Sequence, residues 1–309
     1  MTPGSRRKFC PKRLRGWCDG GLGLLITTFY RGVRSRVRAA RMPAYLLRIV
    51  TMTTQRFWVL VDEMARMSLK ADASRFYFGY FWWILEPLLY VAVFYVVFDV
   101  LLGTRQENFL VFLMVGKLTF VWFSKSVVHA SRTIVSSKGL IGNIDLPKTL
   151  FPLVAIQEGL YRQAAVFALL FVFLLLSGYS VTANWLWLAP VLLVNYLMIV
   201  VASLVGAFLV CIVFDFTVII ALSMIFLLFT SGIFWDVRAL PDPRMAEWVL
   251  LVNPLAFIVD AYRQVLMAGV RPDLWHLAGV AFVALGCIGG LRSLYRSSSQ
   301  YLALKAITS

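Results

Sequence analysis

Residues 185–211 read "WLWLAPVLLVNYLMIVVASLVGAFLVC" and contain no charged side chain. About 20 consecutive apolar residues cross a bilayer as a helix. Inside the bilayer every backbone N–H and C=O must be paired, which restricts spans to helices or closed barrels, and long continuous apolar runs select helices. Of the 309 residues, 61% are hydrophobic and 15% charged, whereas a soluble domain has about a quarter charged residues. We therefore predict an all-α integral membrane protein.

The apolar runs predict six transmembrane helices. They cover residues 82–102, 109–129, 152–176, 185–211, 215–235 and 274–291, approximately. We accordingly divide the chain into a basic cytoplasmic extension, an amphipathic interfacial helix, a six-helix membrane domain and a cytoplasmic tail, at residues 1–55, 56–75, 76–296 and 297–309. Met42 and Met52 are alternative start positions, so part of the extension is expected to be poorly ordered or not made.

Positive charge is concentrated ahead of the first predicted span. Residues 1–75 hold sixteen Lys and Arg against four Asp and Glu. Segments with such an excess stay on the cytoplasmic side, and the charges of the later loops agree, so both termini are predicted inside. Nucleic-acid binding is the other interpretation of a basic block. We favour membrane topology and contact with anionic lipids, since the rest of the chain already requires a membrane.

The sequence lacks the residue patterns of an ATP-hydrolysing protein and those of an enzyme active site. It contains no GxxxxGK[ST] phosphate-binding loop, and its two histidines and four cysteines form no metal-binding or disulfide pattern. Ion-coupled transport normally places Asp, Glu or His in mid-span, and the middle of the last three spans holds none. We predict no enzymatic activity, no cofactor in this chain and an external motor protein.

Residues 56–72, "RFWVLVDEMARMSLKAD", have the pattern of a helix lying in the inner membrane interface. Its predicted apolar face holds Phe57, Leu60, Val61, Met64, Met67 and Ser68. Its predicted polar face holds Asp62, Glu63, Arg66 and Lys70.

Residues 76–90, "FYFGYFWWILEPLLY", are rich in aromatic side chains at the entry to the first span. An interfacial aromatic belt accounts for this composition, and it is the interpretation that we favour on composition alone. A wall on which sugar rings stack is the alternative.

Residues 131–151, "SRTIVSSKGLIGNIDLPKTLF", form the longer internal loop and mix polar with apolar residues. A short amphipathic helix here would fit a groove on a cytoplasmic partner, and an ordinary connecting loop is the equal alternative.

Residues 242–269 contain two helices that are each too short to span. Asp242 and Asn253 are predicted N-caps, with Pro243 and Pro254 at the first helical positions and Gly269 at the end of the second helix. We predict a re-entrant helical hairpin that enters from the outer face between the fifth and sixth spans. On its second helix, Asp260 and Arg263 are expected to pair and to face polar cargo or a hydrated vestibule. A packed extracellular cap is the alternative.

Four blocks in this order resemble the membrane permease of type-2 ABC exporters for bacterial cell-surface polysaccharides. They are "FGYFWWILEP", Gly116 through "VWF", "IVSSKGLIGNIDLPKTLFPL" and "FTSGIFWDVRALP…NPLAFIVDAYRQVLMAG". The resemblance covers about residues 56–296. It departs from the family at Asp72-Ala73, where a basic-aromatic pair is usual.

The resemblance implies a homodimer of six-span subunits with two copies of a separate nucleotide-binding ATPase, which would bind ATP and Mg²⁺. It implies that the interfacial helix is a gate helix for the lipid headgroup, with Phe57, Trp58, Arg66, Lys70 and Arg75 as candidate residues. The internal loop would couple to the ATPase through Ser137, Lys138, Gly139, Leu140, Ile141, Asn143 and Asp145. The hairpin would be an external gate with Asn253, Pro254, Asp260 and Arg263. Candidates for a channel wall that meets substrate are Trp82, Trp83, Glu86, Tyr90 and Trp122.

The implied function is export of lipid-linked polysaccharide, of O-antigen or capsule type, across the bacterial inner membrane. A type-2 ABC permease for a small lipid or a drug is one alternative, and a membrane-embedded lipid-processing enzyme is another. The expected partners are the ATPase, a second copy of the chain, the glycan and membrane lipids, but no nucleic acid.

Overall fold

The computed structural model describes residues 54–75, 79–97, 108–144 and 146–308. The chain divides into two units, residues 1–56 and 57–309, and the second unit carries the fold described below. Within the described ranges every regular element is a helix, as predicted. The predicted basic extension, except its last two residues, lies outside the described residues.

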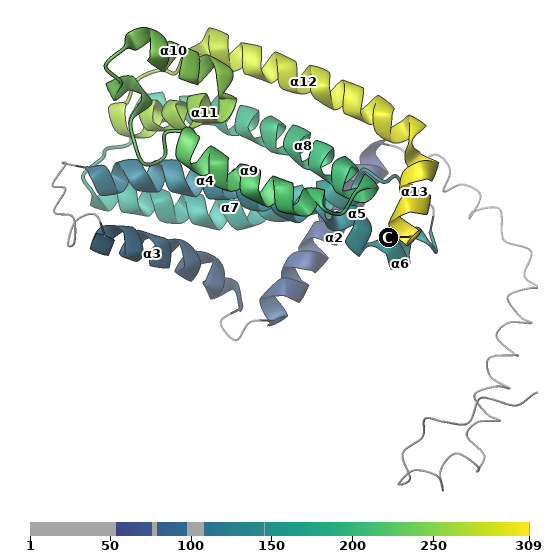
Figure 1. Ribbon diagram of the computed structural model, residues 1–309. Coiled ribbons are helices and arrows are strands. Elements are labelled where there is room, and N and C mark those ends of the chain that lie inside the picture. Colours follow the sequence, from purple (N-terminus) through teal and green to yellow (C-terminus); the bar gives the residue numbers. More distant parts are fainter. Residues whose placement is uncertain (1–53, 76–78, 98–107, 145, 309) are drawn as a thin grey trace, which may run out of the picture. The chain divides into compact units, whose positions relative to one another are not determined.

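The long helices of the second unit follow the apolar runs of the sequence (Figure 1). They are α2 (Thr54–Arg75), α3 (Trp82–Tyr95), α4 (Phe109–Ser131), α7 (Leu150–Leu176), α8 (Leu188–Ile212), α9 (Phe216–Thr230) and α12 (Leu274–Ser297). Shorter helices are η2 (Gly79–Phe81), α5 (Thr133–Ser136), α6 (Lys138–Ile141), η4 (Ala183–Trp187), η5 (Val237–Ala239), α10 (Pro243–Val252), α11 (Pro254–Arg263), the π-helical η6 (Gln264–Ala268) and α13 (Ser299–Thr308).

Four helices are individually long and apolar enough to cross a membrane, and the number rises to six if each of two bent helix pairs counts as one span. The first bent pair joins residues 54–74 to 79–95 at 96°, and the second joins Pro243–Val252 to Pro254–Ala268 at 110°. Large apolar side chains are exposed along α9 and α12, including Phe226 and Phe282. Such surfaces are normal where helices face lipid or another subunit.

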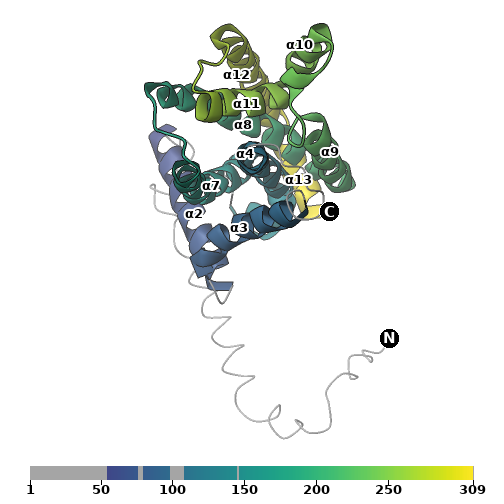
Figure 2. The ribbon, with the colours of Figure 1, turned by 90° about the vertical axis from the view of Figure 1, so that its left-hand side faces the viewer.

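Helix α4 is the centre of the bundle. It contacts α3, α7, α8, α9 and α11, and Figure 2 shows these helices arranged around it. Its contact with α7 depends on a small residue, because a Cβ placed on Gly159 would lie 2.6 Å from the Ser126 hydroxyl oxygen. Small residues at such crossings allow two membrane helices to approach closely.

Several helix ends differ from the predicted spans. Helix α9 ends at Thr230 rather than at residue 235, and its 15 residues are shorter than the hydrocarbon core. The chain turns there because Ser231 and Ile233 are fully buried and the Trp235 indole N–H donates to the carbonyl of Phe229. Of the first predicted span, residues 98–102 lie outside the described residues.

The C-terminal tail forms a helix that was not predicted. Helix α12 continues to Ser297 instead of ending near residue 291, and α13 then packs on α5, α6 and α8. Leu302 and Ala306 are fully buried, and the Cys211 thiol lies 3.5 Å from the carbonyl oxygen of Leu302. Burial of one face of α13 explains why this segment is ordered.

Helix α2 is amphipathic, and its predicted apolar face is confirmed in part, because Val61 is buried and Phe57, Leu60, Met64 and Ser68 are half-buried. The buried residues are Val61, Ala65, Leu69 and Ala73, while Met67 is 67% exposed. Their four-residue spacing defines a narrow stripe of small and medium side chains. The polar groups of α2 that bind α7 lie on or beside this stripe, so they set the face that packs inward.

Candidate functional site

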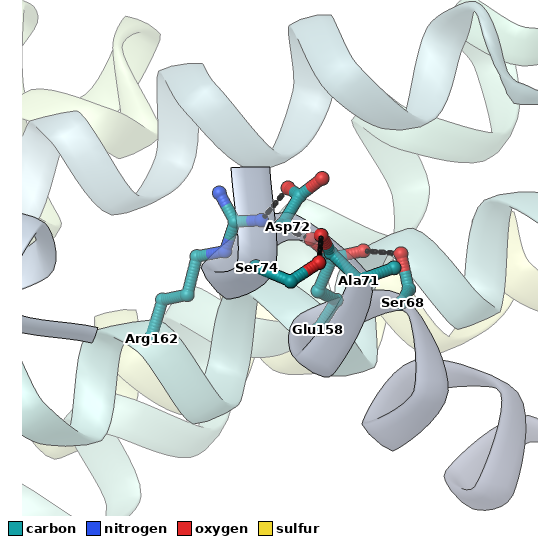
Figure 3. Close-up of polar contacts among 6 residues, drawn as sticks. All are labelled: Ser68, Ala71, Asp72, Ser74, Glu158 and Arg162. Atoms are coloured by element: carbon teal, nitrogen blue, oxygen red, sulfur yellow. Dashed lines mark hydrogen bonds and ion pairs between the residues drawn. The ribbon is translucent and has the colours of Figure 1, made fainter. Parts of the chain in front are cut away.

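The junction of α2 with α7 is built around Arg162 (Figure 3). Its guanidinium forms ion pairs with Asp72 on α2 and with Glu158, one turn earlier on α7. The Glu158 carboxylate is 2% exposed and also accepts a hydrogen bond of 2.7 Å from the Ser68 hydroxyl. A buried carboxylate requires this compensation, so the junction depends on the cation.

A second set of polar contacts joins the first half of α2 to α7. The Tyr161 hydroxyl donates to Asp62, which also pairs with Arg66 at 3.0 Å. Tyr161 and Arg162 are neighbours on α7. These two adjacent residues therefore bind α2 at two separate positions, Asp62 and Asp72. The position of α2 on the bundle is therefore specified by hydrogen bonds as well as by packing.

The predicted gate-helix residues are accessible where the structure describes them. Trp58 is 48% exposed, Arg66 and Lys70 are exposed, and Phe57 is half-buried with its ring 5.8 Å from that of Trp58. The side chain of Arg75 lies outside the described residues.

Helix α3 presents aromatic and charged side chains to α4 and α7. Trp82 and Trp83 are half-buried, and the Arg162 guanidinium lies 5.5 Å from the centre of the Trp83 ring. Glu86 accepts a hydrogen bond from the Lys125 ammonium of α4. Of the predicted wall residues, Trp83 therefore contacts the arginine of the α2–α7 junction.

A lysine on α4 faces the aromatic side of α3. The Lys117 ammonium lies 5.6 Å from the ring centre of Tyr90 and 5.9 Å from that of Phe94, distances typical of cation–π contacts. Tyr90 is 39% exposed. Sequence reasoning missed Lys117, although a lysine within an apolar span is a signal of function.

Trp122 does not form an exposed wall. It is 3% exposed, and its ring meets that of Phe167 edge-on at 5.9 Å. It points into the bundle from the side of α4 that faces α7. The assignment of Trp122 as a wall residue is therefore corrected to a core residue, because the exposed side of α4 could not be deduced from its composition.

Arg263 ties α11 to α4 and to the turn after α9. Its Nη1 donates to the carbonyl of Gly232 at 2.6 Å and its Nη2 to that of Ile233 at 2.9 Å, while Nε and Nη2 each lie 3.3 Å from the carbonyl oxygen of Phe112. The guanidinium carbon lies 3.4 Å from the centre of the Phe112 ring. Only 7% of Arg263 is exposed, so the prediction that it faces a hydrated vestibule is wrong.

Gly116, the glycine of the second block of the family resemblance, leaves room for the Arg263 side chain. A Cβ on Gly116 would lie 2.5 Å from the Arg263 Nη2 atom. The sequence carries both residues but gives no signal that they meet.

The partner of Asp260 is Arg238 rather than Arg263. Arg238 Nε lies 3.0 Å from both carboxylate oxygens and its Nη2 lies 2.8 Å from one of them, and the Gln264 amide donates to the same carboxylate at 2.6 Å. Asp260 is 6% exposed. The hydrogen bond from Arg238 to Asp260 raises the pKa of Arg238 above its ordinary value, so the guanidinium remains charged. The predicted Asp260–Arg263 pair is wrong because η5 brings a stronger, bidentate partner to the carboxylate.

The two short helices begin where the sequence predicts. The Asn253 side-chain oxygen accepts from the backbone N–H groups of Leu255 and Ala256, and Pro254 is the first helical residue. The Asn253 amide also lies 3.1 Å from the Ser231 hydroxyl, which links the bend to the end of α9. Asp242 caps α10 and Gly269 takes the left-handed conformation after η6, as predicted.

The internal loop folds into two single-turn helices, α5 and α6, where one short amphipathic helix was the prediction. Ile134 and Ile141 are buried, whereas Lys138, Gly139, Leu140 and Asn143 are exposed and Ser137 is half-buried. The Asn143 amide donates to the Gly139 carbonyl at 2.7 Å, which keeps the turn compact. Asp145 lies outside the described residues.

Within the described part of the chain, the buried charged groups of these sites join helices to one another. No three His, Cys, Asp or Glu side chains gather there as metal ligands. His276 stacks on Phe257 with ring centres 3.9 Å apart.

Three curated proteins are similar to this chain, and each is described as "O-antigen export system permease protein RfbA". Two are from Klebsiella pneumoniae. One is 24% identical over 213 residues, covering 68% of this chain and 81% of the relative, and the other is 23% identical over 240 residues, covering 74% and 89%. The third, from Myxococcus xanthus, is 21% identical over 244 residues, covering 79% and 94%. No model of a known protein family matches the sequence. The relatives confirm the predicted resemblance, and with the apolar helices they indicate a multi-pass membrane protein.

Proposed function

We propose that this relative of the O-antigen export permeases is the channel-forming subunit of an ATP-driven ABC exporter. Its cargo would be lipid-linked polysaccharide of O-antigen or capsule type, moved outward across the bacterial inner membrane. The observation that carries the proposal is the similarity to three permeases of O-antigen export over 68% to 79% of the chain.

The proposed topology adds α3 and the short helix α9 to the four long helices, and it does not count α10 and α11 as a span. Six spans, formed with α3 as the first and α9 as the fifth, would place both termini in the cytoplasm, and α10 and α11 would form a re-entrant hairpin at the outer face. Helices α8 and α9 contain no charged residue, and large apolar side chains are exposed along α9 and α12, which supports this arrangement. Two copies of the subunit would enclose the channel.

The α2–α7 junction supports a role for α2 in cargo entry. Helix α2 lies across the start of α3 with a 96° bend, and its exposed side carries Trp58, Arg66 and Lys70. Cationic and aromatic groups at an interface are suited to the headgroup of a lipid-linked glycan. Trp82 and Trp83 are half-buried, so part of each indole would be available to stack on a sugar ring.

The exposed side of α6 supports contact with the ATPase. Lys138, Leu140 and Asn143 project from a turn whose other side is packed through Ile141. Two ATPase copies, which would bind ATP and Mg²⁺, would move the two permease subunits through these loops. The permease itself would perform no catalysis.

The test is deletion of the gene in its native bacterium, followed by complementation with a tagged copy. Loss of surface polysaccharide with accumulation of lipid-linked glycan inside the cell is expected, together with an ATPase that co-purifies with the tagged permease. A strain with normal surface glycan, but with an altered lipid or drug distribution, would replace the proposal with a permease for a small molecule. Turnover of a lipid by the purified chain without an ATPase would replace it with an enzyme.

A further inference from the structure

A cavity of about 470 Å³ lies where α12 and α13 meet the segment that leads into α7. Its lining consists of Lys148, Arg296, Ser297, Ser299, Gln300 and Ala303. Two of these side chains are cationic, and three others offer hydroxyl or amide groups. None of the described residues that line it is acidic. The lining is therefore suited to an anion with several oxygen atoms.

The two cationic side chains of the cavity, Lys148 and Arg296, differ in their burial. Lys148 is 4% exposed, and its ammonium donates to the carbonyl of Leu146 at 3.0 Å, which fixes it at the wall of the cavity. An ammonium has three N–H donors, and a guanidinium has five in a fork that matches two phosphate oxygens. Arg296 is exposed on the last turn of α12, from which it can close over a bound group.

The cavity lies at the ends of two candidate spans. Helix α12 ends at Ser297 and α7 begins at Leu150, so the lining residues are adjacent to the boundary of the apolar segments. In Figure 1, α13 turns away from the end of α12 toward α6. Basic pockets between membrane helices at this level bind the phosphates of anionic lipid headgroups.

We propose that this cavity is a phosphate-binding site, filled either by the phosphodiester of an anionic phospholipid or by inorganic phosphate. Arg296 donates two hydrogen bonds to the phosphate oxygens, Lys148 supplies the second positive charge, and Ser299 donates from the start of α13. A phosphate in this position joins α12, α13 and the segment before α7. The site is separate from the α2–α7 junction and does not depend on which cargo the protein exports.

The test uses the full-length protein purified in detergent. It is titrated separately with phosphatidylglycerol, with phosphatidylcholine and with inorganic phosphate, and the rise in unfolding temperature gives each affinity. Phosphatidylglycerol is expected to stabilise the wild-type protein more than phosphatidylcholine does. Arg296→Gln removes a charge-assisted contact and should weaken binding of the anion about tenfold. Lys148 is left intact because its loss from a buried position would also affect folding.

Arg292→Gln is the matched control. Arg292 is exposed one turn earlier on α12 and does not line the cavity, so this variant should keep the wild-type affinity. Stabilisation by inorganic phosphate alone, lost in Arg296→Gln, supports the site and identifies a soluble phosphate as its source. Equal binding by the Arg296 and Arg292 variants, or equal stabilisation by both lipids and none by phosphate, overturns the proposal.

Discussion

Arg263 of α11 occupies the space that a side chain at Gly116 of α4 would need. The Nη2 atom lies 2.5 Å from the position of a Cβ on that glycine, and it is held there by the carbonyl of Ile233 and by the face of Phe112. A terminal atom of a long side chain can usually move away. Here the movement would break hydrogen bonds in a buried site, so the glycine and the arginine act together.

Gly116→Ala should therefore lower the stability of the protein. Displacement of the guanidinium weakens hydrogen bonds from a charged donor, which is expected to cost about 1–3 kcal/mol. Thermal unfolding in detergent measures the effect. Gly279→Ala is the control, because Gly279 lies in α12 with no atom within 4 Å of an added Cβ. Equal unfolding temperatures for the two variants would show that Arg263 adjusts freely.

The Asp260–Arg238 pair should respond to a charge swap. Arg238→Ala leaves a buried carboxylate with Gln264 as its remaining partner, and a loss of about 1–3 kcal/mol is expected. The double variant Asp260→Arg with Arg238→Asp should recover part of that loss. Arg244→Ala, at an exposed position of α10, serves as the control for a lost surface arginine. The same stability for Arg238→Ala and Arg244→Ala would contradict the importance of the pair.

Arg162 should contribute more to stability than Arg66, although both pair with carboxylates. Arg162→Gln leaves Glu158, which is 2% exposed, without its ion pair, whereas Arg66→Gln breaks a pair whose arginine is exposed to solvent, and such pairs contribute little to stability. Unfolding temperatures of the two variants decide the question. Adding Glu158→Gln to Arg162→Gln should restore part of the stability, since the double variant buries no unpaired charge. A double variant less stable than Arg162→Gln would refute this explanation.

The aromatic residues of α3 and α4 should separate into two classes. Trp122→Ala removes a buried indole and is expected to cost about 3–5 kcal/mol, seen as a loss of folded protein. Trp82→Ala and Trp83→Ala should leave more folded protein while lowering surface polysaccharide, if they form the proposed wall. Normal polysaccharide at normal expression of both variants would remove the wall from the proposed function.

The loop variants Leu140→Asp and Ile141→Ala test contact with the ATPase. Leu140 is 36% exposed and Ile141 is 6% exposed. Leu140→Asp should abolish co-purification of the ATPase at an unchanged unfolding temperature, because it alters only the surface. Ile141→Ala should lower the unfolding temperature by loss of packing. Full recovery of the ATPase with Leu140→Asp would place the contact elsewhere.

Parts of the candidate site could be read from the sequence because they depend on neighbours in the chain. Asn253 and Pro254 start α11 as predicted, since an N-cap needs only its own side chain and the next few amides. The buried face of α2 could be predicted only in part, for the opposite reason: Met67 is exposed, and Ala65 and Leu69 are buried instead. Its orientation depends on Tyr161 and Arg162, about 90 residues or more away in the chain.

The amino-acid sequence is enough to predict a helical, membrane-embedded protein, because the length of an apolar run and the demand for paired backbone groups are local properties. It also carries the family resemblance and predicts the position of the bend before α11. The pairing of Asp260 with Arg238, the burial of Arg263 beside Gly116 and the packing of α13 on α6 are visible only in the folded protein. These contacts join distant segments, and a charged residue selects among several possible partners by geometry that packing alone creates.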